Sequence, residues 1–125
     1  MINHIDHLVL TTTNQNLCID FYTRVLKMNL VTFGEQRYAI QFGQQKINIH
    51  QYGQEFEPKA HLPVPGSLDL CFISDTPLEQ IIEHIQNQKV TIIDGPIKRT
   101  GAMGDILSIY IRDPDLNLIE ISNYC

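Results

Sequence analysis

The sequence predicts an α+β fold: two βαβββ modules forming a cup-shaped, partly open, eight-stranded mixed sheet with the helices outside. Strand-like and helix-like stretches follow one another in the order βαβββ, and the same order returns after a proline-rich loop. Each module alone would be one helix on a small sheet, with too little apolar cover for independent stability. We therefore expect two modules side by side, with a concave face that can hold a ligand.

The first module is expected over residues 1–53. Apolar and β-branched residues predict an opening strand over His4–Thr11. Asn14 is the candidate N-cap of the following helix, which has apolar residues at helical spacing and ends near Lys27. Glycine-containing turns then separate three predicted strands: Leu30–Phe33, Arg37–Phe42 and Lys46–Tyr52. Residues 54–66 hold three prolines and form the predicted linker.

The second module is expected over residues 67–125 and opens with a strand over Leu68–Ser74. Asp75 or Thr76 is expected to cap the second helix, with Pro77 in its first turn, where a missing N–H costs nothing. Turn residues separate the remaining predicted strands: Val90–Ile93, Ile106–Arg112 and Leu118–Asn123. The two modules together make one domain over residues 1–125.

The composition narrows the class of protein. Apolar content of 43% and charged content of 18% are typical of a soluble globular domain. The formal net charge of −5 argues against a nucleic-acid partner, which needs a basic face. No apolar run reaches the ~18 residues of a membrane span, and the amino terminus lacks a signal pattern. Cys18, Cys71 and Cys125 are far apart and indicate reduced thiols in a cytoplasmic protein.

Strand alternation places several polar side chains on the concave face. Because side chains alternate across a strand, residues that interrupt an apolar run point away from the core. The residues selected in this way are His7, Asn48, His50, Asp69, Cys71, Glu120 and Ser122. The repeat pairs His7 with Asp69 and Asn48 with Glu120, related by a pseudo-two-fold axis. Polar residues at such symmetric places on apolar strands are hard to explain as packing.

An imidazole together with carboxylates suits a divalent metal with open coordination positions, such as Mn, Fe, Ni, Co or Zn. Such an ion can bind two neighbouring oxygens of a substrate and act as a Lewis acid. Glu120 could alternatively serve as a general base if burial raised its pKa. A salt bridge remains the other explanation for a charged residue in this apolar strand.

Two motifs at opposite ends of the chain resemble a known superfamily. Ile5–Leu10 followed by Phe21–Met28 is similar to "DHLVL…FYxxVLGM", and Arg112–Glu120 is similar to "RDPDGNLIE", with Leu116 in place of the turn glycine. These are motifs of the vicinal-oxygen-chelate superfamily, the glyoxalase, bleomycin-resistance and ring-cleaving dioxygenase group. Gln45–Gln51, with the strand after the linker, resembles a subgroup of small glyoxalase-domain proteins, some of which carry a virulence label.

The resemblance implies a set of metal ligands. The family positions fall on His7, Asn48, Asp69 and Glu120, of which His7 and Glu120 match the usual residue types. Asp69 stands where His is usual, and Asn48 is a weaker ligand than Glu or Gln. His50 could supply the missing imidazole. We therefore expect a metal on His7, Asp69, Glu120 and His50, with Asn48 as a substrate contact.

Other residues are candidate substrate contacts. The stretch Gly95–Gly101 is expected to be a loop, at the place where related thiol transferases that act on fosfomycin bind an anionic substrate. There Lys98 and Arg99 could hold a carboxylate, phosphonate or glutathione group, although a solvated turn is the commoner role of such a pair. Cys71 and Tyr110 are further candidates, with a core position as the alternative for each.

Three functions follow from the resemblance. The first is a metal-dependent lyase, isomerase or thiol transferase of glyoxalase type, acting on a small, anionic or thiol-adduct substrate. The second is a non-catalytic small-molecule-binding module, like the bleomycin-sequestering members, and the third is an extradiol dioxygenase. Members of this size usually form homodimers. In that arrangement His7 and His50 of one subunit would meet Asp69 and Glu120 of the other.

Overall fold

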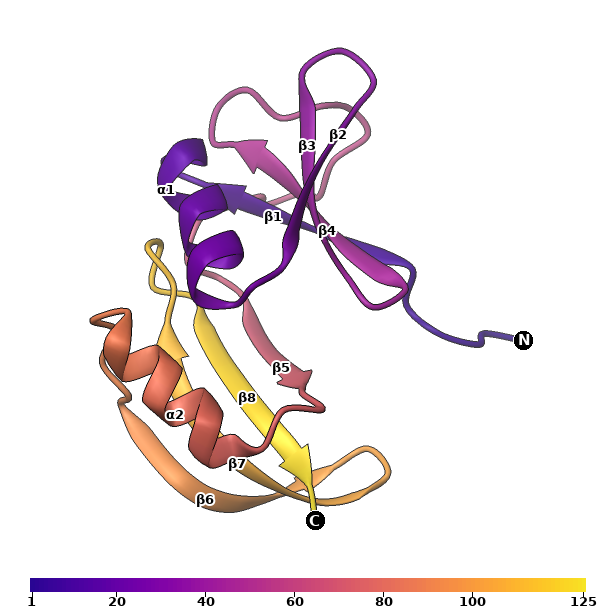
Figure 1. Cartoon of the computed structure of the whole chain (residues 1–125). Coiled ribbons are helices and arrows are strands. Elements are labelled where there is room, and N and C mark those ends of the chain that lie inside the picture. The colour runs from indigo at the N-terminus through magenta and orange to yellow at the C-terminus, as the bar shows by residue number, and fades with distance from the viewer. The chain divides into compact units, whose positions relative to one another are not determined.

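The computed structural model describes all 125 residues, which divide into two compact units, Met1–Ser67 and Leu68–Cys125 (Figure 1). Each unit contains one four-stranded mixed sheet with helical structure on one face. This confirms the α+β class and the repeated βαβββ order. The eight strands are divided between two separate sheets, neither of them closed, because no strand of one sheet pairs with a strand of the other. None of the helices combines the length and the apolar composition that a membrane span requires.

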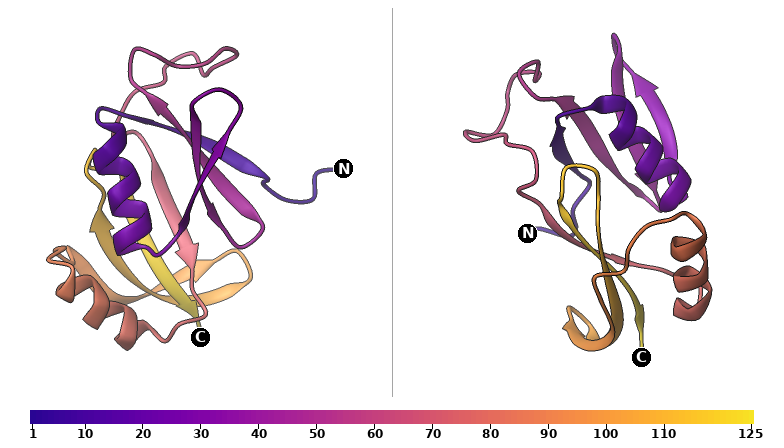
Figure 2. Two further views of the ribbon diagram at one scale, coloured as in Figure 1. Left: turned by 45° about the horizontal axis from the view of Figure 1, so that its top comes forward. Right: turned by 90° about the vertical axis from the view of Figure 1, so that its left-hand side faces the viewer.

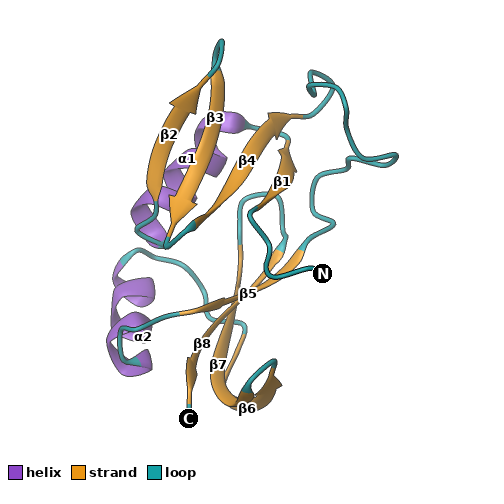
Figure 3. Ribbon diagram, turned by 90° about the vertical axis from the view of Figure 1, so that its right-hand side faces the viewer, coloured by secondary structure: helices purple, strands orange, loops and turns teal.

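The first unit places one helical segment on a sheet of order β1-β4-β3-β2, in which only β1 and β4 run parallel. Its elements are β1 (His7–Thr12), α1 (Gln15–Asp20), a π-helical turn η1 (Phe21–Val25), β2 (Asn29–Phe33), β3 (Arg37–Phe42) and β4 (Gln45–Gln51). Figure 3 shows α1 crossing one face of this sheet. The core between them consists of Leu10, Cys18, Phe21, Tyr22, Val25, Ile40, Ile47 and Ile49.

Local signals in the first unit were accurate at the start of the helix and less so at its end. Asn14 caps α1, since its side-chain oxygen accepts the Leu17 N–H at 3.0 Å, as predicted. The α-helix stops at Asp20 and continues as one π-helical turn to Val25, short of the expected end. A Thr23 hydroxyl that donates to the Ile19 carbonyl at 2.7 Å accompanies this change of helix type.

The second unit repeats the arrangement, with sheet order β5-β8-β7-β6 and only β5 and β8 parallel. Its elements are β5 (Asp69–Ile73), α2 (Leu78–Asn87), β6 (Asp94–Gly101), β7 (Gly104–Arg112) and β8 (Leu118–Tyr124). Helix α2 lies along one face of this sheet (Figure 2). The core consists of Leu78 and Ile85 from the helix with Ile109, Ile111, Ile119 and Ile121 from β7 and β8.

Two predictions about the strands of the second unit were wrong. The predicted strand Val90–Ile93 is not a strand, and Gly95–Gly101, expected as a loop, belongs to β6. Gly-Pro normally interrupts a strand, but β6 is an edge strand whose pairing with β7 shifts register between Asp94 and Ile97. Gly95 has φ +92°, and a Cβ there would collide with a β7 carbonyl. Pairing with β7 therefore overrides the local loop signal.

The second helix is capped by tertiary structure. Pro77 occupies the N-cap position, so neither Asp75 nor Thr76 caps α2 as expected. The N–H of Leu78 is instead bound by the side-chain oxygen of Asn123, on β8, at 2.7 Å. A side-chain amide 45 residues away in sequence thus satisfies a helix N-terminal N–H that a local capping residue would otherwise bind.

The β7–β8 turn holds Leu116 in a strained conformation. Leu116 has φ +69° and its side chain is exposed, so it packs against nothing that would compensate. A left-handed conformation costs an L-residue about 1–2 kcal/mol, and glycine avoids that cost. We expect Leu116→Gly to raise the free energy of unfolding in urea by about 1 kcal/mol. Leu116→Ala, which keeps a Cβ, is the control, and equal gains in both variants would contradict this explanation.

Candidate functional site

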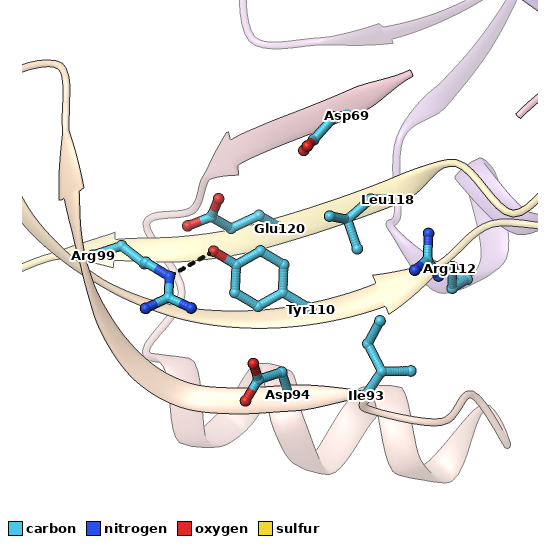
Figure 4. Close-up of a pocket in the computed structure, with 8 residues that line it drawn as sticks. All are labelled: Asp69, Ile93, Asp94, Arg99, Tyr110, Arg112, Leu118 and Glu120. Atoms are coloured by element: carbon cyan, nitrogen blue, oxygen red, sulfur yellow. Dashed lines mark hydrogen bonds between the residues drawn. The ribbon is translucent and has the colours of Figure 1, made fainter. Parts of the chain in front are cut away.

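The sheet of the second unit has a hollowed face opposite α2. Because alternate residues of paired strands share a face, Asp69, Arg99, Tyr110 and Glu120 project together from four different strands (Figure 4). They line a hollow of about 400 Å³, called here the larger hollow. The other residues that line it are Ile93, Asp94, Arg112 and Leu118. Strand alternation thus brings three predicted site residues of β5, β7 and β8 together.

Glu120 is anchored by one of its two carboxylate oxygens. Its Oε2 accepts a hydrogen bond from the hydroxyl of Ser108 at 2.6 Å and lies 3.5 Å from the hydroxyl of Ser122. Both serines are fully buried, and their oxygens are 2.6 Å apart. The Cys71 thiol also interacts with this carboxylate, and neither serine donates to Oε1. The carboxylate is therefore held in one orientation with one oxygen left for a ligand.

Arg99 and Tyr110 form a second fixed group in the larger hollow. The Nε–H of Arg99 donates to the Tyr110 hydroxyl oxygen at 3.0 Å, and this bond is the main reason that the pKa of Arg99 is raised. Arg99 has no carboxylate within ion-pair distance, so its remaining N–H groups are available to an anion. Lys98 points to the opposite face of β6 and pairs with Asp105 at 3.1 Å. Of the two predicted cations, only Arg99 lines the hollow.

Three residues of this face escaped sequence reasoning. Ser108 and Arg112 lie on the same face of β7 as Tyr110, so alternation alone could have selected them. Asp94 faces Tyr110 across the β6–β7 pair, but the rest of its strand, Gly95–Gly101, was predicted as a loop. For Ser108 and Arg112 the missed signal was alternation along β7, and for Asp94 it was the register with β7.

Cys71 lines an adjacent hollow of about 370 Å³, called here the smaller hollow. Its apolar wall includes Ile73, Ile106 and Tyr124, and it shares Arg99 and Glu120 with the larger hollow. Burial raises the pKa of the Cys71 thiol, whose sulfur lies 3.5 Å from the Ser122 hydroxyl. A protonated thiol is a poor nucleophile, so Cys71 suits a contact role.

In the first unit, His7 stands at the start of β1 with one ring nitrogen engaged. Its Nδ1 lies 2.8 Å from a carboxylate oxygen of Asp6, and this hydrogen bond is the main cause of the lowered pKa of Asp6. Nε2 has no partner. Metal-binding histidines usually have this arrangement, with the second nitrogen bound to a carboxylate.

Asn48 and His50 share the face of β4 opposite α1, and both are buried, at 6% and 4% exposure. The Asn48 Oδ1 and the His50 Nε2 have no hydrogen-bond partner. The His50 ring meets the Phe56 ring edge-on, with 5.5 Å between centroids. Burial, and then the charge of Arg37, lower the pKa of His50, while Glu55 acts in the opposite direction. His50 is therefore a neutral imidazole at neutral pH.

This lowered pKa predicts how stability depends on pH. The unfolded chain binds a proton at His50 more readily than the folded chain, so stability is retained above about pH 6.5 and lost as the pH falls below it. We expect His50→Gln to lose less stability than the wild type between about pH 7 and pH 5, measured by urea unfolding. Equal losses in both proteins would exclude His50 as the source.

The structure does not gather the predicted metal ligands into one cluster. No three His, Cys, Asp or Glu side chains come together as a group that could hold a metal ion. His7 and His50 belong to the first unit, and Asp69 and Glu120 belong to the second. His50 also lies beside a cation, Arg37, which disfavours a metal ion there.

Comparison with known proteins places the chain in a family. The profile of the glyoxalase/bleomycin resistance protein/dioxygenase superfamily matches residues 4–121. Virulence protein STM3117 of Salmonella typhimurium is 55% identical over 124 residues, which cover 99% of this chain and 86% of that protein. The glyoxalase domain-containing protein RDO1 of Mycosarcoma maydis is 54% identical over 123 residues, 98% of this chain and 69% of that protein.

Solved structures agree with this assignment. The crystal structure of STM3117 superposes with a TM-score of 0.99 at 54% identity, covering 100% of this chain and 99% of that chain. A lactoylglutathione lyase from Agrobacterium tumefaciens shares the fold, with a TM-score of 0.75 at 17% identity and coverage of 98% and 95%. The chain therefore belongs to the glyoxalase, bleomycin resistance protein and dioxygenase superfamily.

Proposed function

We propose that the protein is a divalent-metal-dependent enzyme of glyoxalase type: a lyase, isomerase or thiol transferase acting on a small, anionic, oxygen-rich substrate. The observation that carries this proposal is the Glu120 carboxylate. Two buried serines fix one of its oxygens, and the other is left in a hollow that also contains Arg99. Preorganised charges of this kind are typical of catalytic sites.

The donor atoms fit a divalent metal. His7 is hydrogen-bonded to Asp6 through Nδ1, which leaves Nε2 to bind a metal. Glu120 accepts the Ser108 hydroxyl bond at Oε2, which leaves Oε1 to bind a metal. With Asp69, they supply the nitrogen and oxygen donors that suit Mn, Fe, Co, Ni or Zn. When bound, the metal would polarise two neighbouring oxygens of the substrate as a Lewis acid.

The chain's own residues have distinct roles in this proposal. Glu120 is the metal ligand, or the general base toward a carbon next to a carbonyl. Arg99 binds the anionic part of the substrate. Since the Tyr110 oxygen accepts from Arg99, its own O–H remains free to donate to a substrate oxygen. Cys71 contacts the apolar part of the substrate in the smaller hollow.

The ligand set draws on both units, and we propose that a homodimer assembles it, with His7 from one copy and Asp69 and Glu120 from the other. Symmetric dimers are the commonest oligomers of soluble proteins. Sedimentation at micromolar concentration should give the mass of two chains. A monomer that binds metal fully would exclude this arrangement.

Metal titration tests the proposed function. Calorimetry with MnCl₂ on metal-free protein should show saturable binding, and His7→Ala should weaken it by more than about 100-fold, because removal of an outer partner alone already costs 10–100-fold. His61→Ala is the matched control, since His61 is an exposed loop residue. Absence of binding by Mn, Fe, Co, Ni and Zn, or unchanged binding in His7→Ala, would refute the proposal.

A second candidate function is a non-catalytic small-molecule-binding module. It is supported by the apolar wall of the smaller hollow, formed by Ile73, Ile106 and Tyr124. Apolar hollows with a few polar groups are typical of such sites. Thermal shift assays discriminate the two functions: stabilisation by apolar or cationic drugs, with no response to divalent metals, would favour the binding module.

A further inference from the structure

We propose that the first unit carries a separate binding site for an anionic oxygen group, a carboxylate or phosphate of a small molecule, formed by Arg37, Lys46, Asn48 and His50. This proposal deepens the proposed function by naming a charged group of the substrate. Only the identification of the anion as part of a substrate rests on the proposed function. The site lies on the face of the β1–β4–β3–β2 sheet opposite α1.

The guanidinium of Arg37 is held by aromatic rings. Its central carbon lies 4.5 Å from the centre of the Phe56 ring and 5.0 Å from that of the Phe33 ring. Ring contacts use the flat faces of a guanidinium and leave the N–H groups in its plane free. None of these N–H groups bonds to a carboxylate or carbonyl of the protein. Arg37 is thus a preorientated cation without an anionic partner.

A second cation lies on the same aromatic ring. The ammonium of Lys46 is 4.0 Å from the centre of the Phe33 ring. Lys46 makes no ion pair. Its charge contributes to the lowered pKa of Asp6, but that carboxylate bonds to His7. Neither of the two cations around Phe33 forms an ion pair; the nearest carboxylates that act on this region, Asp6 and Glu55, are bound to His7 and Lys59.

Asn48 and His50 supply unsatisfied polar atoms beside these cations. The register pairs Ala39 with Asn48 and Tyr38 with Ile49, so the next residues, Arg37 and His50, share one face of neighbouring strands. Phe56 contacts both of them. The buried Asn48 Oδ1 and His50 Nε2 have no partner, which is costly in a folded protein. An anionic oxygen can accept a hydrogen bond from the His50 Nε2, whereas the Asn48 Oδ1 is itself an acceptor and needs a donor such as the O–H of a hydrogen phosphate.

The chemistry of these four groups selects an anion over a metal ion. Two cations that form no ion pair repel a metal and attract an oxyanion. The planar edge of Arg37 matches the paired oxygens of a carboxylate or phosphate. A neutral imidazole can donate one hydrogen bond from its ring. The cluster therefore offers charge and directional donors to one small anionic group.

Anion titration of metal-free protein tests the proposal. The probes are sodium malonate and, separately, sodium phosphate, at constant ionic strength set with NaCl. The readout is the ¹⁵N shift of the His50 imidazole, assigned by its loss in His50→Gln. We expect a saturable shift with at least one probe, and which of the two binds more tightly identifies the group as carboxylate or phosphate.

Variants make the test specific. Arg37→Gln should weaken the binding by at least tenfold, and Arg37→Lys less, because it keeps the charge and loses the planar fork. Lys46→Gln is a second variant for the case that Arg37→Gln fails to fold. Arg24→Gln, an exposed arginine on the π-helical turn that pairs with Asp20, is the control and should bind like the wild type. The proposal would be overturned by the absence of a shift or by a shift that only follows ionic strength. It would also be overturned if Arg37→Gln and Lys46→Gln both bound the anion as tightly as the wild type.

The two proposals fail separately. The anion titration uses no metal, and the metal titration with His7→Ala uses no anion ligand. Loss of metal binding with an intact His50 response would leave the anion site standing. Intact metal binding with no His50 response would remove the anion site and leave the proposed function.

Discussion

Glu120→Gln should weaken binding of Mn²⁺ by more than about 100-fold, because it removes the negative charge of the best-oriented ligand. The substitution keeps the size of the side chain, and the glutamine oxygen can still accept the Ser108 hydroxyl bond of 2.6 Å. We therefore expect the free energy of unfolding of the metal-free variant to stay close to that of the wild type. Calorimetric titration with MnCl₂ measures the affinity, and urea unfolding measures the stability.

Two further variants separate charge from position. Glu79→Gln removes one carboxylate from the exposed face of α2 and controls for net charge. Glu120→Asp keeps the charge but shortens the side chain by one methylene group, so its affinity for Mn²⁺ should lie between those of Glu120→Gln and the wild type. Wild-type affinity in Glu120→Gln would show that this carboxylate is not a ligand, and Glu120 would then keep only its possible role as a base.

Asp113→Ala should destabilise the protein by about 3 kcal/mol, since it removes a buried carboxylate with several hydrogen bonds. Asp113 is 3% exposed. Its Oδ1 accepts the N–H groups of Asp115 and Asn117 at 2.9 Å each, and its Oδ2 accepts the Asn117 amide at 2.8 Å. The Asn117 side chain in turn accepts the Leu68 N–H at 2.8 Å, next to the start of β5. One carboxylate thus ties the β7–β8 turn to a third strand.

Urea unfolding of Asp113→Ala and Asp75→Ala gives the comparison. Asp75 is exposed and makes no hydrogen bond or ion pair, so its removal should change the free energy of unfolding by less than about 0.5 kcal/mol. A loss below about 1 kcal/mol in Asp113→Ala would mean that the turn is held by its backbone alone.

Sequence reasoning was accurate where a structural choice depends on near neighbours. The Asn14 cap needs only the N–H of a residue three positions on, and Arg37–Phe42 is a strand with the predicted ends. Alternation also placed Asp69, Cys71 and Glu120 on one face of the second sheet. In these cases the relevant geometry repeats every two residues in a strand or every turn of a helix.

Sequence reasoning was inaccurate where a partner distant in sequence decides the local structure or the direction of a side chain. The Gly95–Pro96 pair predicts a loop between strands, yet pairing with β7 makes it part of a strand. Lys98 and Arg99 look equivalent in sequence, but edge-strand register directs Lys98 to Asp105 and Arg99 to the larger hollow. The predicted metal role of His50 stays a prediction, but its contact with Phe56, whose ring also contacts Arg37, involves residues from other segments that local sequence could not indicate.

By itself, the sequence determined the α+β class, the βαβββ repeat and the strand faces that bear Glu120, Asp69 and His7, because periodicity and turn chemistry act over a few residues. The tertiary structure decided which side chains are already paired and which remain free. Ser108 holds one oxygen of Glu120, and Asn48 and His50 stay unsatisfied beside Arg37. Such partners come from strands that meet only after folding, so no local pattern encodes them.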